Sequence, residues 1–142
     1  MPRIMQHVKG GVEIWIRTRD EHPPPHVHVE HHAQGWEIKV EFSYIENQPS
    51  TYLIHPVGGK LPTKSKLNAL AQEIMNARRE CRDNWWLHVP DAGLANKRVL
   101  IDNGWASPAK PGALGSILVA TAEYLAPIES MKFNGNIVGL CP

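Results

Sequence analysis

Two histidines separated by one valine are the residues whose types and spacing most directly suggest chemistry. His26 and His28 lie in the alternating run from His26 to His31. In an extended strand, this alternation places His26, His28 and Glu30 on one face. Imidazoles at this spacing can converge on one metal ion, with Zn–N distances of about 2.0 Å. Together with Glu30, or with Asp20 or His22 from the preceding connector, they predict a candidate site for zinc, iron or manganese.

Three interpretations of this histidine strand remain open. The first is a partly covered sheet face on which hydrogen-bonded histidines hold no ligand. The second is a metal site, which in a metal-dependent hydrolase or nuclease would activate a bound water, with His22 or Glu30 as the base. The third is a polar surface that recognises a protein or a nucleic acid. Because His-x-His restricts the chemistry less than HExxH does, the sequence alone does not choose between them.

The histidine strand is expected to lie in a small antiparallel sheet. Apolar and polar residues alternate from Val12 to Ile16 and again from Trp36 to Phe42, which indicates strands with one buried face. The triple proline Pro23 to Pro25 lacks N–H donors and predicts a stiff connector rather than a strand. The short apolar run Tyr52 to Ile54 is a candidate fourth strand.

One long amphipathic helix is predicted from Thr63 to Asn84. Its apolar residues, which include Cys81, recur at spacings of three and four and would dock on the sheet. The Thr63 hydroxyl can cap the first turn, and Pro90 sets the limit beyond which the helix cannot continue.

Basic and aromatic residues gather near the end of this predicted helix. Arg78, Arg79 and Arg82 could contact the phosphates of a nucleic acid, although a solvated face with i,i+4 ion pairs is the alternative. Trp85 and Trp86 are adjacent, so both indoles are not expected to face inward. One of them is therefore a candidate contact for a protein partner.

The chain beyond Pro90 is expected to form a helix-containing extension. Val99 to Ile101 is a candidate strand, and residues 102–112 are rich in residues typical of loops. The run from Leu114 to Leu125 is apolar almost all round and predicts a buried helix. A homodimer contact through residues 113–125 is the alternative use of this segment.

Composition fits one globular domain spanning residues 1–142. Its 142 residues carry 15 Lys or Arg and 14 Asp or Glu, so a net charge of +1 favours neither nucleic acid nor an anionic membrane. Cys81 and Cys141 form no CxxC motif, which fits a reducing cytoplasm. No apolar run approaches the roughly 20 residues that span a bilayer, so we expect no membrane association. The absence of GxSxG and phosphate-loop motifs disfavours nucleophilic and nucleotide-driven chemistry.

Several features in order resemble one protein family. The segment from Asp20 to Val29, the turn Gly59 to Pro62 and the helix end Asn84–Trp85 resemble the signature of domain of unknown function family 4160. The resemblance covers residues of about 10–89 and departs from the family at Val27, where an aromatic residue is usual. It implies a small bacterial protein of the toxin-antitoxin type with a partner encoded nearby. By position, the signature residues are Pro24, Pro25, His26, His28 and Trp85, and the family assigns none of them a role.

These observations predict an α+β fold: a small curled antiparallel sheet of three or four strands covered by one long helix, with residues 90–142 appended to a core at 10–89. The leading functional hypothesis is an interaction module of a toxin-antitoxin or mobile-element system that binds a protein partner. A metal-dependent hydrolase or nuclease using the histidine strand and a nucleic-acid-binding protein using the basic helix are the alternatives.

Overall fold

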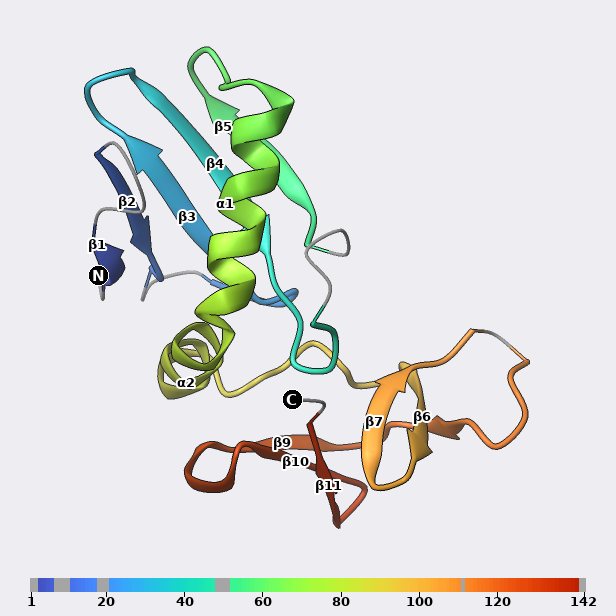
Figure 1. The fold of residues 1–142 in the computed structure, drawn as a ribbon. Helices are drawn as coiled ribbons and strands as arrows, with labels where there is room; N and C mark the ends of the chain where they lie inside the picture. Colours follow the sequence, from blue (N-terminus) through green and yellow to red (C-terminus); the bar gives the residue numbers. More distant parts are fainter. Residues whose placement is uncertain (1–2, 7–10, 18–20, 48–51, 111, 141–142) are drawn as a thin grey trace.

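The protein has an α+β fold with two sheets and two α-helices (Figure 1). The computed structural model describes residues 3–6, 11–17, 21–47, 52–110 and 112–140. The first sheet is antiparallel with the order β1-β2-β3-β4-β5, so β3 lies at its centre. Its strands are β1 (Arg3–Gln6), β2 (Val12–Trp15), β3 (His26–His31), β4 (Trp36–Glu41) and β5 (Ile54–Gly58).

The three central strands lie where the sequence predicts them, whereas the two edge strands differ from the prediction. β3 has the predicted bounds, while β2 and β4 end one residue before the predicted Ile16 and Phe42. The fourth predicted strand begins only at Ile54 and continues through Pro56, which an edge strand tolerates because its outer side needs no donor. β1 is an additional strand at the opposite edge.

The first sheet has one apolar and one polar face. In the register, Ile14 lies opposite Val29, and Val29 lies opposite Ile38, so their side chains share a face. All three are fully buried, in the same core as Leu70 and Ile74 of α1 (Lys64–Asn76). Figure 1 shows α1 lying across this face of the sheet. The opposite face carries His26 and His28 together with Glu13, Glu30 and Glu37.

The predicted long helix is two helices. α1 ends at Asn76, Ala77 leaves helical geometry at φ −97° and ψ 21°, and α2 (Arg78–His88) runs in a different direction (Figure 1). The apolar spacing continues through Ala77, so the pattern gives no sign of the break. α1 covers the sheet, whereas α2 packs at its end and against the second sheet. The Thr63 cap is confirmed, because its Oγ1 accepts a hydrogen bond from the Lys66 amide at 3.4 Å.

The second sheet replaces the predicted C-terminal helix. Its order is β8-β6-β7-β11-β10-β9, and all its strands come from residues after 97. They are β6 (Arg98–Asp102), β7 (Trp105–Pro108), β8 (Ile117–Leu118), β9 (Ala122–Leu125), β10 (Ser130–Phe133) and β11 (Asn136–Gly139), with the 3-10 turn η2 (Ala126–Ile128) between β9 and β10. β6 confirms the strand predicted at Val99 to Ile101, whereas β7 lies inside the predicted loop.

The helix predicted in the run from Leu114 to Leu125 is wrong because distant segments supply strand partners for it. β8 pairs with β6, and β9 pairs with β10. Between them the side chain of Asn134 accepts hydrogen bonds from the amides of Ala120 at 2.7 Å and Thr121 at 3.2 Å. An apolar run of this length is equally compatible with helix or strand until its neighbours are known.

Helix α2 joins the two sheets. Tyr44, just after β4, packs edge-on against Tyr124 of β9 with ring centroids 5.0 Å apart. The Tyr44 hydroxyl donates to the Arg82 carbonyl at 2.6 Å, and the Tyr124 hydroxyl donates to Asp83 Oδ1 at 2.5 Å. Burial raises the pKa of both phenols far above the usual range, so both remain donors. Among the described residues, neither helix is long and apolar enough to cross a membrane.

Candidate metal site

His26 and His28 project from the same face of β3, as the alternation predicts. Their ring centroids lie 5.2 Å apart, and the residues are only 4% and 8% exposed. In the register, His28 lies between Trp15 of β2 and Lys39 of β4. The indole of Trp85 covers His26 from α2 with a centroid separation of 5.0 Å. A central strand and a helix end therefore bury two imidazoles on the otherwise polar face.

The carboxylate that joins these histidines is Glu21. Its Oε1 lies 3.1 Å from Nε2 of His28, and its Oε2 contacts Nε2 of His26. One ligand atom from each of the three residues lies within 4.8 Å of the other two. The prediction gave Asp20, His22 or Glu30 as the further ligand. His22 and Glu30 do not belong to this cluster, and Asp20 lies outside the described residues. His22 is exposed, and no periodic pattern in the connector indicates that Glu21 turns inward.

The triple-proline connector positions Glu21. The amide of Phe42 donates to the Pro25 carbonyl at 3.0 Å. On another side, Gly93 has a φ of +71° and lies so close that a Cβ there would be 3.2 Å from both Pro23 Cβ and Pro25 Cδ. The connector is thus held between the end of β4 and the segment after α2, which fixes where Glu21 meets the sheet.

The hydrogen bond at Nδ1 of His26 shows which of the two ring nitrogens carries the proton. Nδ1 of His26 lies 2.8 Å from the Pro24 carbonyl, and a carbonyl can only accept, so Nδ1 carries the proton. A neutral His26 then presents the lone pair of Nε2 to the Glu21 carboxylate. Two acceptors repel at contact distance, so a proton or a cation must lie between Nε2 and Oε2.

His28 is held in its neutral form. Burial lowers the pKa of His28, and the nearby positive charge of Arg17 lowers it further, although Glu21 opposes both effects. Its Nδ1 makes no hydrogen bond among the described residues and lies 3.8 Å from Oε2 of Glu37. Neutral imidazole is the form that coordinates a metal.

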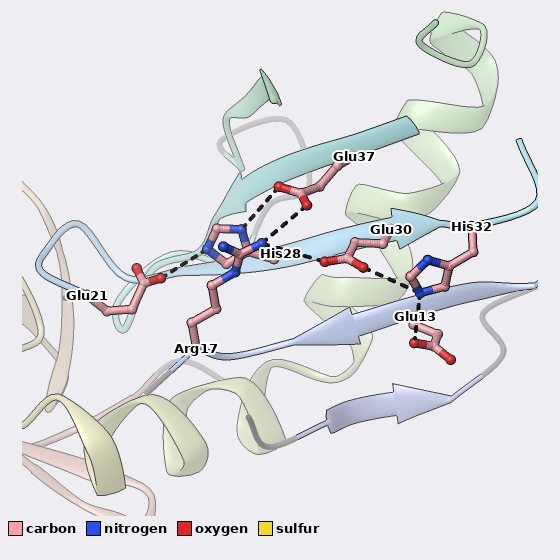
Figure 2. Close-up of polar contacts among 7 residues, drawn as sticks. All are labelled: Glu13, Arg17, Glu21, His28, Glu30, His32 and Glu37. Atoms are coloured by element: carbon pink, nitrogen blue, oxygen red, sulfur yellow. Dashed lines mark hydrogen bonds and ion pairs between the residues drawn. The ribbon is translucent and has the colours of Figure 1, made fainter. Parts of the chain in front are cut away.

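Glu30 shares the face but belongs to a neighbouring ionic network (Figure 2). Glu13, Glu30 and Glu37 lie directly opposite one another on β2, β3 and β4. Arg17 Nη2 lies 3.6 Å from Glu30 and 3.2 Å from Glu37, while His32 Nε2 lies 3.4 Å from Glu13 and 3.5 Å from Glu30. Burial and then the Glu37 charge raise the pKa of Glu30.

The chemistry of the Glu21–His26–His28 cluster is that of a two-histidine, one-carboxylate ligand set. Zn²⁺, Mn²⁺ and Fe²⁺ are the ions that accept such a set. Metal-bound histidines commonly donate their other N–H to a carbonyl, as His26 does to Pro24. The structure therefore contains a set of two histidines and one carboxylate of the kind the sequence predicts, with Glu21 as the carboxylate in place of Glu30.

The three candidate arginines lie on α2 and do not belong to this cluster. Arg82 is buried, with its Nε donating to the Ser43 carbonyl at 2.9 Å, so it is not part of a solvated basic face. Arg78 and Arg79 line a pocket that faces the second sheet. Cys81 is buried as predicted, and burial raises its pKa to about 12; Cys141 lies outside the described residues.

Of the two tryptophans, one of which the sequence predicts to be exposed for a partner, Trp85 is buried and Trp86 is partly buried. Trp85 is fully buried and donates its Nε1 hydrogen to the Asp91 carbonyl at 2.8 Å. Trp86 is partly buried between Tyr44 and Tyr124, with centroids 6.4 Å and 6.3 Å away. Both adjacent indoles pack against other parts of the protein because α2 lies between the first sheet and the second. The second sheet was not predicted from the sequence.

Comparison with known proteins found no significant match of this chain to a protein-family model, to a curated protein or to a solved structure.

Proposed function

We propose that this chain binds one divalent transition-metal ion, most simply Zn²⁺, through Glu21, His26 and His28. The observation that carries the proposal is the hydrogen bond from His26 Nδ1 to Pro24, which turns the Nε2 lone pair toward the Glu21 carboxylate. A metal ion removes the repulsion between these two acceptors. It also suits His28, whose lowered pKa keeps its imidazole neutral.

The burial of the ligands favours a structural ion over a catalytic one. The histidines are almost fully buried, and the Glu21 side chain is 11% exposed. A hydrolase or nuclease needs an open coordination position that a substrate can approach. Here a substrate would have to displace the connector that carries Glu21. The ion would instead clamp this connector to the centre of the sheet.

A clamped connector supports the hypothesis of an interaction module. His22 and Pro24 are exposed beside the partly buried Glu21 and the buried Pro25, so the metal would present a rigid polar and apolar edge to a protein partner. The resemblance to family 4160 adds the proposed context, a toxin-antitoxin-type pair with the partner encoded nearby. In this role the metal organises the recognition surface and takes no part in a reaction.

Metal content tests the site directly. Protein without a histidine tag is purified, stripped with a chelator and titrated with Zn²⁺ in competition with a chromogenic chelator. We expect about one equivalent per chain, and proton release on binding if a shared proton is displaced. Glu21→Gln and His26→Gln should each weaken the affinity by about 10- to 100-fold or more, since each removes a ligand.

Matched controls lie on the same sheet face. Glu13→Gln and His32→Asn remove a carboxylate and an imidazole from the neighbouring network and should leave Zn²⁺ affinity within about twofold, with folding checked by circular dichroism. Folded wild-type protein that binds no Zn²⁺, Mn²⁺ or Fe²⁺ below about 100 μM overturns the proposal. In that case a protonated His26 shares its proton with Glu21.

Partner binding is tested separately with the protein product of the adjacent gene. Co-purification from the native cell that is lost on His22→Ala or on metal removal supports the clamped connector as the contact surface. Co-purification that is unaffected by both changes places the partner elsewhere, without bearing on metal binding itself.

A further inference from the structure

A second candidate site lies between the helices and the second sheet, and it does not depend on the proposed metal. A pocket of about 570 Å³ is formed where α1 meets α2 and faces β7, η2 and β10. Its lining includes Arg78, Arg79, Arg82, Trp105, Tyr124 and Ile128. Ligand pockets in proteins commonly have volumes of about 300–1,000 Å³. The pocket is therefore large enough for a small molecule or for one end of a polymer.

Positive charge in this pocket exceeds the negative charge that faces it. Arg82 is 4% exposed and donates to neutral acceptors: the Ser43 carbonyl at 2.9 Å, Asn47 Oδ1 at 3.0 Å and the Glu46 carbonyl at 3.5 Å. Arg78 donates to the Met75 carbonyl at 3.2 Å. Among ion pairs between described residues, none includes either arginine. Buried charges are normally paired, so this arrangement favours an anion from outside the described chain.

Arg79 is the one lining arginine with carboxylate partners. Its Nη1 lies 3.4 Å from Glu129 Oε2, and its Nε lies 3.9 Å from Asp83 Oδ2, in contacts that are largely exposed. Exposed pairs of this length contribute little, so an incoming phosphate can compete for the guanidinium. The Arg78 charge also lowers the pKa of Arg82, after burial, which shows that the two cations act on each other.

An aromatic platform completes the pocket. Trp105 at the start of β7 is 43% exposed. Its ring packs against Gly139 of β11 so closely that a Cβ at Gly139 would lie 3.2 Å from two of its ring carbons. Glycine thus lets the indole lie on the sheet, with the remainder of the ring open to the pocket. Exposed tryptophans beside arginines are the elements with which proteins stack bases and bind phosphates.

We infer that this pocket binds a nucleoside phosphate, either a free nucleotide or the terminal nucleotide of a single strand, with the phosphate at Arg78 and Arg79 and the base on Trp105. The buried Arg82 supplies positive potential without needing to reach the ligand. A single pocket holds one nucleotide, so this differs from a basic helix face that follows a nucleic-acid backbone. Both sources share the same chemistry and are separated by the test.

Isothermal titration of the full chain with AMP, adenosine, inorganic phosphate and a single-stranded decanucleotide tests the inference. We expect AMP or the oligonucleotide to bind with a Kd below about 1 mM and at least tenfold more tightly than adenosine or phosphate alone. Equal affinity for AMP and the oligonucleotide indicates a single-nucleotide site, whereas tighter binding of the oligonucleotide indicates nucleic acid. The affinity should fall as salt rises, because the phosphate contact is ionic.

Variants locate the ligand. Arg78→Gln and Trp105→Ala should each weaken AMP binding by about tenfold, the loss of one charge-assisted contact or one stacked base. Arg98→Gln is the matched control, because this exposed β6 arginine bonds Ser116 outside the pocket and should change binding by less than twofold. No binding of any nucleotide by folded protein, equal losses in Arg98→Gln and Arg78→Gln, or binding of a phosphotyrosine peptide in place of nucleotides overturns the inference.

Discussion

The indole of Trp85 lies 5.0 Å from the imidazole of His26, centroid to centroid, and so connects helix α2 to the candidate metal site. The same indole packs edge-on against Phe42 at 6.2 Å and is fully buried. Its Nε1 hydrogen is donated to the Asp91 carbonyl, which ties down the segment that holds the proline connector. One side chain thus contacts His26 and also holds the segment that positions Glu21.

Replacing Trp85 is expected to lower the stability of the protein. Trp85→Ala should lower the free energy of unfolding by about 3–5 kcal/mol, because a large buried ring is removed. Trp85→Phe should cost less while still losing the hydrogen bond to Asp91. Urea denaturation measures both, and Leu87→Ala on the same helix, at a side chain that is 75% exposed, is the control and should cost under about 0.5 kcal/mol. A cost for Trp85→Ala no larger than the control would contradict this packing role.

The free energy of unfolding should depend on pH because His28 is buried in its neutral form. Its pKa in the folded protein lies below the ordinary value of 6.5, so below that value the unfolded chain binds more protons and stability falls. Above pH 6.5 both states are neutral, and this contribution to the pH dependence disappears. Unfolding followed from about pH 5 to about pH 8 in the presence of a chelator should be flatter for His28→Asn than for wild type. Parallel curves for the two proteins would show that His28 is not protonated differently on unfolding.

Glu30→Gln should stabilise the protein at neutral pH. Glu30 lies between Glu13 and Glu37 on adjacent strands, and its pKa is raised above the ordinary value of 4.5. A carboxylate with a raised folded-state pKa reduces stability as the pH rises through 4.5 to that higher value. Removing its charge should therefore add about 0.5 kcal/mol at neutral pH, after the loss of the Arg17 contact, and nothing near pH 4. Thermal melts at both pH values measure the difference, and a loss of stability at neutral pH would mean that the Arg17 attraction is the larger effect.

The second sheet should be coupled to α2 through Tyr124 and Asp83. Tyr124→Phe removes a hydrogen bond of 2.5 Å to the Asp83 carboxylate and should cost about 1.5 kcal/mol. A double-mutant cycle with Asp83→Asn isolates the pair from the ring packing against Tyr44 and Trp86. Costs for the two single variants that simply add in the double variant would show that the two side chains act independently.

The local pattern of the sequence determined the centre of the first sheet and the sharing of a face by His26 and His28. Strand alternation and helix spacing depend on residues two, three or four positions apart, so the bounds of β3, the Thr63 cap and the burial of Cys81 follow from sequence alone.

Tertiary structure decided the features that depend on distant partners. The connector has no periodicity, so only the packing of Gly93 and Phe42 against the prolines places Glu21 beside the histidines. The apolar run from Leu114 forms strands because β6 and β10 pair with its two ends. Arg82 and Trp85 are buried by contacts with Ser43 and Phe42, which lie far from them in the sequence. Whether an apolar or charged side chain is buried depends on which distant segments pack against it. The local sequence around that side chain does not specify those segments.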